Sequence, residues 1–314
     1  MSIANPYTHG SNSIEVHNVG LRRKVTIASL TVAIILIGAK FAAYVITDSV
    51  SVMTSLLDST FDALASAVTM VSVMHAATPA DEDHRFGHGK IEALAALGQS
   101  IFIFGSAGYL FFESSHRFLH PQPVKEAFVG IEVMILSIIL TVILVTFQRY
   151  VIRRTASVAI SADHLHYKGD LLMNIGVLSA LGLGYYGHWL YFDPLFAGII
   201  SFVLLIGAWK ISREAYGILM DKELSDEDRA RIETLVKAHP QVRAIHDLRT
   251  RDSGRVTFIA FHLELDGDMT LKKSHDVTEE LELAIYKEFP KAEVLIHQEP
   301  AGLVDHRIDN EIKG

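Results

Sequence analysis

Long apolar runs separated by short polar connections fill the first two thirds of the chain. A helix that crosses a lipid bilayer needs about 20 predominantly apolar residues, and each run is long enough. The pattern therefore predicts an α-helical membrane protein with six transmembrane helices within residues 21–212. The runs cover residues 25–46, 50–77, 91–112, 128–147, 158–187 and 190–209.

The pattern changes after residue 212, where apolar positions recur with shorter periods. Ser225 precedes three acidic residues and a helical apolar spacing, which is typical of a capped helix start. The predicted elements are a helix over 225–237, a hairpin over 242–249 and 256–265, a helix over 270–289 and a strand over 292–297. This α-β-β-α-β order indicates a small α+β domain over residues 213–300. Residues 1–20 and 301–314 are predicted to be a flexible leader and a flexible tail.

The composition agrees with this division and limits the chemistry. Half of the residues are hydrophobic and only 20% are charged, which is too apolar for an ordinary soluble protein. The chain has no cysteine, so any metal must be held by His, Asp or Glu. Residues 213–314 contain 15 Lys and Arg against 22 Asp and Glu, and this acidic balance argues against nucleic acid as a partner.

The distribution of Lys and Arg predicts the orientation in the membrane. Cytoplasmic connections of membrane proteins carry an excess of these residues. The connections opposite the termini contain only Arg117 and Lys125. The side of the two termini contains Arg22, Arg23, Lys24, Arg85, Lys90, Arg149, Arg153, Arg154, Lys210 and Arg213. Both termini and the C-terminal domain are therefore predicted to be cytoplasmic.

Two of the apolar runs carry ionisable residues that predict a metal site. Asp58 and Asp62 are spaced i, i+4, as are His166 and Asp170, so each pair shares one helix face. Asp163 lies three residues before His166 and joins that face. Ionisable residues at membrane depth cost several kcal/mol each and usually mark function. Three carboxylates and an imidazole suit a divalent transition metal such as Zn²⁺ or Fe²⁺. The alternative is that these charges lie at helix ends and reach water.

A polar connection provides a second candidate cluster. Asp81, His84 and His88 follow the second apolar run with a spacing that lets two imidazoles and one carboxylate converge from a short turn. The alternative is a solvated loop whose histidines bind nothing, because short His/Asp matches are common by chance.

The predicted C-terminal domain provides a third cluster. Its candidates occur on three different predicted elements, and they are His246, His262, His275, His297 and Glu299. Together they are expected to form a binuclear metal site bridged by Glu299. For any single histidine of this group, an ordinary surface position remains the alternative.

With these residues in view, the chain resembles the cation diffusion facilitator family, especially its bacterial zinc/ferrous-iron efflux branch. The resemblance covers about residues 21–300 and rests on several unrelated motifs in the family's order. The motifs are Leu57-Asp58-Ser59-x-x-Asp62, His84-Arg-Phe-Gly-His88-Gly-Lys90-x-Glu92, Ala162-Asp163-x-Leu165-His166-Tyr-x-x-Asp170, His246-Asp-Leu-Arg-Thr-Arg251, Phe261-His262-Leu-Glu264 and Ile296-His297-Gln-Glu299-Pro300.

The resemblance implies a homodimer in the bacterial cytoplasmic membrane, with six transmembrane helices per subunit and a ferredoxin-like cytoplasmic domain. It implies alternating access driven by exchange of a divalent metal ion for protons. The first cluster would be the transport site, and the other two would be a loop site and a cytoplasmic site. The branch usually has Asp where this chain has Glu299, whose longer side chain changes the bridge geometry.

Divalent metal efflux by proton antiport is the predicted function. A membrane-anchored metal sensor or scaffold without transport is the main alternative, although it would not need the four intramembrane ligands. A channel is a further alternative, but conduction favours weaker sites. The chain has no H-E-x-x-H motif, and the two ligand-bearing runs contain no Glu. A metalloenzyme typically needs a Glu near the metal as general base, so both absences argue against this class. The hard ligand set leaves Zn²⁺, Fe²⁺, Cd²⁺ and Mn²⁺ open as substrates.

Overall fold

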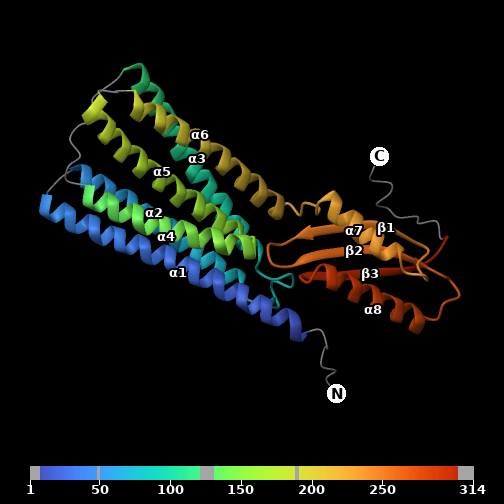
Figure 1. Cartoon of the computed structure of the whole chain (residues 1–314). Coiled ribbons are helices and arrows are strands. Elements are labelled where there is room, and N and C mark those ends of the chain that lie inside the picture. Colours follow the sequence, from blue (N-terminus) through green and yellow to red (C-terminus); the bar gives the residue numbers. More distant parts are fainter. Residues whose placement is uncertain (1–7, 48–49, 121–130, 188–190, 303–314) are drawn as a thin grey trace. The chain divides into compact units, whose positions relative to one another are not determined.

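The structure of this chain is a computed structural model that describes residues 8–47, 50–120, 131–187 and 191–302 (Figure 1). The chain divides into two compact units, Met1–Leu219 and Met220–Gly314. The first unit consists of helices and their connections. The second combines two helices with a three-stranded sheet.

Long helices make up the described part of the first unit, as the hydropathy pattern predicted. They are α1 (Thr8–Thr47), α2 (Val50–Ala76), α3 (Lys90–Leu119), α4 (Ile131–Thr155), α5 (Val158–Gly187) and α6 (Phe192–Leu219). Five of the six are long and apolar enough to cross a membrane, and α5 is the exception among the described residues. The first half of α5 carries Asp163, Lys168 and Asp170 between its apolar residues. The predicted helical membrane domain is thus confirmed, and both α2 and α5 carry candidate ligands.

The first helix differs from the prediction at its start. Residues 8–20, predicted as part of a flexible leader, are helical and continuous with the apolar part of α1. No proline lies between Pro6 and Pro79, and extending an existing helix costs far less than starting one. Residues 1–7 and most of the predicted tail, residues 303–314, lie outside the described residues.

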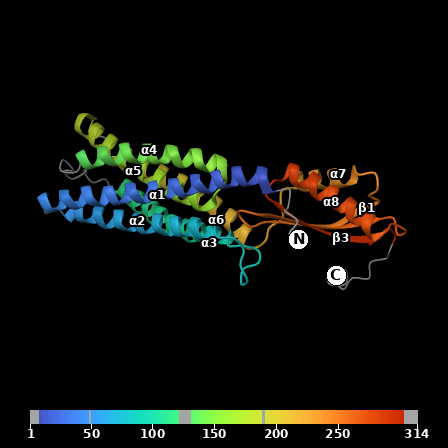
Figure 2. The ribbon, with the colours of Figure 1, turned by 90° about the horizontal axis from the view of Figure 1, so that it is seen from below.

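The helices of this unit lie side by side (Figures 1 and 2), with α3 packed along α6 and α1 packed along α2 and α4. Between these groups lies α5, which contacts α2, α3, α4 and α6. The approach of α5 to α6 is close, because a Cβ added to Gly207 would lie 2.7 Å from Leu165 Cδ1. The polar side chains of α5 are therefore held among the other helices.

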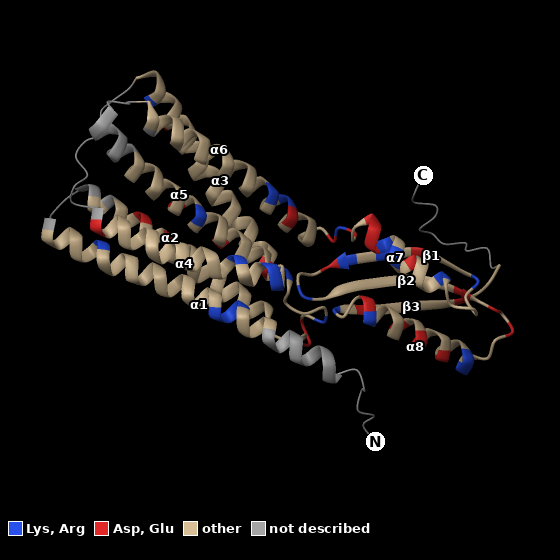
Figure 3. Cartoon of the chain, in the orientation of Figure 1, with Lys and Arg blue, Asp and Glu red and all other residues tan. Residues whose placement is uncertain are grey.

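Charged residues gather near one end of the helical unit, whereas the rest of the helix length carries only a few (Figure 3). This end, called the basic end below, is where α2 and α4 end and α3 and α5 begin. Arg22 of α1 donates to Thr155 at the end of α4, so this end includes Arg22, Arg23 and Lys24 of α1 and Arg149, Arg153 and Arg154 of α4. The polar segments that the sequence assigns to the cytoplasm thus share one end of the unit.

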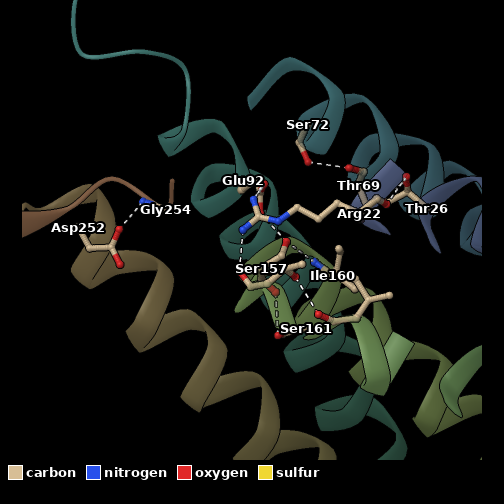
Figure 4. Close-up of polar contacts among 12 residues, drawn as sticks. Arg22, Thr26, Thr69, Ser72, Glu92, Ser157, Ile160, Ser161, Asp252 and Gly254 are labelled. Atoms are coloured by element: carbon tan, nitrogen blue, oxygen red, sulfur yellow. Dashed lines mark hydrogen bonds and ion pairs between the residues drawn. The ribbon is translucent and has the colours of Figure 1, made fainter. Parts of the chain in front are cut away.

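A buried ion pair lies at the basic end (Figure 4). Arg22 Nη1 donates to Glu92 Oε1 at 2.7 Å, and both side chains are almost fully buried. Arg22 Nη2 also donates to the carbonyl of Thr155 at 2.6 Å, and the hydroxyl of Ser157 donates to Glu92. Ala156, between Thr155 and Ser157, has φ +49°, and the chain reverses there from α4 to α5. The pair thereby ties α1 and α3 to the α4–α5 turn.

The second unit contains α7 (Asp226–Lys237), β1 (Ala244–Asp252), β2 (Thr257–Leu265), α8 (Leu271–Glu288) and β3 (Ala292–Pro300). The predicted α-β-β-α-β order is confirmed. The predicted cap is also present, because Ser225 Oγ accepts from Asp228 N at 3.1 Å. The strand order is β1-β2-β3, with β1 antiparallel and β3 parallel to β2.

The two faces of this sheet differ in chemistry. Ile259, Phe261 and Leu263 of β2 are buried in one core with apolar residues of α7 and α8. Successive side chains of a strand point to opposite faces, so His262 and Glu264 lie on the face away from the helices. This second face is called the histidine face below.

Candidate metal centres

The first centre lies where α2 meets α5. His166 Nε2 lies 2.7 Å from Asp62 Oδ1 and 3.6 Å from Asp170 Oδ2. One ligand atom from each of these three residues lies within 4.8 Å of the other two. The i, i+4 spacing places His166 and Asp170 on one face of α5, and α2 supplies the third ligand. An imidazole and two carboxylates are suitable ligands for a divalent transition metal.

A cavity of about 200 Å³ adjoins this trio. Its lining includes the carboxylates Asp58, Asp62 and Asp170. Asp58 is not part of the three-residue group, although it lines the same cavity one helical turn along α2. Other lining residues, Lys40, Ser55 and Asn174 among them, lie farther from the basic end than the trio does. The cavity therefore extends from the trio toward the opposite end of the unit.

Asp163 has a different environment from the one its spacing predicted. It is almost fully buried and accepts from Ser66 Oγ at 3.0 Å and from Gln148 Nε2 at 2.8 Å. Ser66 Oγ also hydrogen-bonds to the hydroxyl of Tyr167 at 2.9 Å. This network joins α2, α4 and α5 on the side of the trio nearer the basic end. Its side chains fill that side with buried polar groups.

Lys40 of α1 is a residue that the sequence analysis missed. Its ammonium donates to the carbonyl of Ser55 at 3.1 Å and to Ser59 Oγ at 2.5 Å, and it lines the same cavity as the carboxylates. The available signal was a lysine within a membrane-length apolar run, a position that marks function by default.

The second centre is the connection between α2 and α3. Asp81 lies 3.3 Å from His84 Nδ1 through one carboxylate oxygen and 3.4 Å from His88 Nε2 through the other. One ligand atom from each of these three residues lies within 4.8 Å of the other two, which is close enough for the three to share one ion. The backbone N–H of His84 donates to Asp81 and holds the pKa of that carboxyl below its ordinary value. The carboxylate is therefore ionised and ready to bind a cation.

Two details add to this centre. His88 Nδ1 is buried and makes no hydrogen bond, so it has unused capacity as a ligand or donor. The ring of His75, in the last turn of α2, lies 4.9 Å from the ring of His88. His75 was not among the predicted ligands, because it falls at the end of an apolar run rather than within the Asp/His spacing.

The third centre occupies the histidine face of the sheet. His246, His262 and His297 are register partners on β1, β2 and β3, so they lie side by side in one row. Glu299 Oε1 lies 2.7 Å from His246 Nε2, and Glu299 Oε2 lies 3.3 Å from His262 Nδ1. The ring of His297 lies 4.6 Å from that of His262. Both oxygens of Glu299 thus face imidazoles, which is the arrangement a bridging carboxylate needs.

The structure brings only some of the predicted residues of this cluster into one compact group. The compact group is His246, His262 and Glu299, whereas His275 is exposed on α8 and is not part of it. Glu264 was not predicted as a ligand, yet its Oε1 lies 3.2 Å from His246 Nδ1. Its position two residues after His262 on the same strand was the available signal, because residues i and i+2 share a face.

Comparisons with known proteins cover nearly the whole chain. Residues 26–220 match the cation efflux transmembrane domain, and residues 224–301 match the cytoplasmic domain of cation efflux proteins. The chain is 43% identical over 281 residues to the cation-efflux pump FieF of Klebsiella pneumoniae, covering 90% of this chain and 93% of that protein. It is 44% identical over 285 residues to FieF of Salmonella arizonae, covering 91% and 95%.

A match also exists to a solved structure, the metal-bound C-terminal domain of the CzcD transporter from Thermotoga maritima. The two sequences are 31% identical, the match covers 25% of this chain and 93% of that one, and the TM-score is 0.24. The two family matches follow one another along the chain and coincide with its helical and its α+β unit. The resemblance seen in the sequence motifs is confirmed, and the chain belongs to the cation efflux family, the cation diffusion facilitators.

Proposed function

We propose that this protein exports divalent transition-metal cations across a bacterial cytoplasmic membrane. The observation that carries the proposal is the convergence of Asp62, His166 and Asp170 from two long helices of a membrane unit. Ionisable groups are costly in that setting unless they serve a cation or a proton path. The curated relatives are cation-efflux pumps, and the family is one of transporters rather than enzymes.

Protons are the proposed counter-substrate. Metal binding requires ionised carboxylates and neutral imidazole, so an arriving cation displaces protons from the site and arriving protons displace the cation. Histidine is the side chain that ordinarily titrates near physiological pH, which suits His166 to this exchange. A proton gradient directed into the cell would then drive metal outward.

Alternating access is proposed for the movement itself. The cavity beside the trio extends away from the basic end, and the Asp163 network and the Arg22–Glu92 pair fill the other side. This arrangement is the one expected of a site that communicates with only one side of the membrane. Opening the basic end would require these buried polar contacts to separate. The basic end is proposed to be cytoplasmic, because of the excess of Lys and Arg there.

The predicted ligands keep their proposed roles. Asp58, Asp62, His166 and Asp170 form the transport site, and Asp81, His84 and His88 form the loop site. The third site comprises His246, His262, His297 and Glu299, with His275 as a further ligand. Zn²⁺ and Fe²⁺ are the proposed substrates, and Cd²⁺ and Mn²⁺ are further candidates, because the carboxylates and imidazole include no soft ligand that would select among these metals. The protein is proposed to act as a homodimer, because residues 224–301 match a family domain whose name refers to dimers.

Flux measurements in proteoliposomes test the proposal. Purified protein would be reconstituted, a pH gradient imposed, and the movement of Zn²⁺, Fe²⁺, Mn²⁺ and Cd²⁺ followed for the wild type and for Asp62→Ala. We expect gradient-dependent flux of at least one metal in the wild type and its loss in the variant. Absence of flux in both, with metal still bound by the C-terminal unit, would instead favour a metal sensor or scaffold.

A further inference from the structure

Lys40 is a cationic side chain placed in a cavity that is otherwise suited to cations. It lies in α1, within a candidate membrane span that runs from Asn18 to Ile46. Its ammonium bonds to the carbonyl of Ser55 and to Ser59 Oγ, at 3.1 and 2.5 Å. A lysine at membrane depth is costly, and neither of these two neutral acceptors needs a charged donor. Its charge therefore calls for an explanation beyond these two bonds.

The explanation lies in the other groups of the cavity. Lys40 shares its lining with Asp58, Asp62 and Asp170. Lys40 also holds the turn of α2 that presents two of these carboxylates, because Ser59 directly follows Asp58 and lies three residues before Asp62. The ammonium is thus held in the same cavity as these carboxylates.

Charge balance shows what this arrangement does. Three ionised carboxylates and a divalent cation leave one excess negative charge, and the ammonium of Lys40 cancels it. Opposite charges attract strongly where the dielectric constant is low, so three carboxylates without a counter-charge would hold a metal ion tightly. A transporter must also release its cargo, and a site that binds too tightly turns over slowly.

We infer that Lys40 is the fixed counter-charge of the transport site, which weakens the binding of divalent cations enough to allow their release. The inference rests on the proposed function of the Asp62–His166–Asp170 site. Lys40 acts through the carboxylates and is a positioning residue rather than a ligand. Removing its charge should tighten metal binding and slow turnover. Removing a ligand should instead weaken metal binding and also slow turnover.

The test measures Zn²⁺ affinity and flux in the same proteins. The background is full-length protein carrying His84→Ala, His88→Ala, His262→Ala and Glu299→Gln, which leaves the transport site as the main binding site. Lys40→Gln removes the charge, Lys40→Met does so with an apolar side chain, and Lys40→Arg retains it. Asp62→Asn in the same background shows that the remaining binding is at this site.

Lys40→Gln and Lys40→Met are each expected to lower the Zn²⁺ Kd by about tenfold or more, because a nearby positive charge is removed at low dielectric constant. Their maximal flux should fall while their KM also falls, and Lys40→Arg should restore both toward the wild type. An unchanged or weaker affinity in the folded Gln and Met variants would overturn the inference.

The Zn²⁺ Kd values of the Lys40 variants test the counter-charge inference separately from the proposed function. If no protein in the series transports metal, the proposed function fails, and the Kd of the Lys40 variants still decides whether the charge weakens binding. If the Arg variant behaves like the Gln variant, Lys40 acts by its shape and hydrogen bonds, and the counter-charge inference is wrong.

Discussion

His166 Nε2 lies 2.7 Å from Asp62 Oδ1, and this contact joins α5 to α2 across 104 residues of sequence. A metal ion bound to both side chains would take the place of the direct hydrogen bond. Ligand atoms bound to one zinc ion are about 3.3 Å apart, so loading would move the two side chains slightly apart. Occupancy of the site is thus expected to change the α2–α5 contact, which links binding to helix position.

His166→Gln is expected to reduce metal flux by at least a hundredfold. Glutamine retains a polar side chain of similar reach but lacks the imidazole nitrogen that binds a transition metal well. Initial rates of Zn²⁺ uptake into proteoliposomes would measure the effect.

His164→Gln provides the matched control on the same helix. His164 is two residues away, so it points to a different side of α5, and it belongs to none of the compact ligand groups found among the described residues. Its substitution should leave flux within about twofold of the wild type. Equal losses in the two variants would contradict a specific role for His166.

Asp81→Asn is expected to weaken metal binding at the loop site by the same factor at pH 7.5 and at pH 5.5. The pKa of Asp81 is lowered, chiefly by the His84 backbone N–H, so the carboxylate is ionised at both values. A group with a lowered pKa loses its contribution only as the pH falls through that lowered value, which is below this range. Overall affinity should still fall on acidification, since histidine ligands take up protons.

Isothermal titration with Zn²⁺ at the two pH values would measure this factor, in a background with Asp62→Asn, His262→Ala and Glu299→Gln. A mutational effect that vanishes at pH 5.5 would show that Asp81 is already protonated there, contrary to its hydrogen bonding.

His262→Ala is expected to abolish tight metal binding by the C-terminal unit, whereas His275→Ala should leave one metal ion bound per chain. His262 lies in the row of register partners and faces Glu299, while His275 is exposed on α8 outside the compact group. Metal-to-protein ratios after dialysis would distinguish the two variants in a background that carries Asp62→Asn and Asp81→Asn. Complete loss of metal in His275→Ala would show that the compact group is insufficient.

Separating the Arg22–Glu92 pair is expected to destabilise the helical unit by roughly 3–5 kcal/mol, because either single substitution leaves an uncompensated buried charge. Thermal unfolding of Arg22→Met and Glu92→Met in detergent would show this as a lowered midpoint. The double variant Arg22→Met/Glu92→Met should recover much of the loss, since two apolar side chains need no partner. Additive losses would mean that the two side chains stabilise the protein independently.

Much of the fold follows from local patterns in the sequence. Long apolar runs predict membrane helices, because a helix satisfies its own backbone hydrogen bonds within a lipid bilayer. Alternation of apolar and polar residues predicts strands. The i, i+4 spacing likewise placed His166 and Asp170 on one face, and the structure brings them to Asp62. Helix starts were less predictable, because α1 extends back to Thr8 through polar residues that favour neither state strongly.

Contacts between different helices or strands could not be predicted from the sequence in the same way. The row of His246, His262 and His297 depends on strand register, which a bulge in β1 shifts between His246 and Arg249. The contact of Glu264 with His246 on the neighbouring strand also depends on that register. Lys40 and Asp58 meet in one cavity only because α1 packs along α2. Such pairings are set by tertiary packing rather than by spacing along one element.

Simultaneous recording of metal and proton movement in one liposome preparation decides whether the protein exchanges a divalent cation for protons. Zn²⁺ would be loaded on one side at equal pH with the membrane potential clamped by a potassium ionophore, and luminal Zn²⁺ and pH would be followed together. We expect protons to move opposite to Zn²⁺ in the wild type, and neither movement in Asp62→Asn. Zinc flux without any proton movement would contradict the exchange at Asp62, His166 and Asp170.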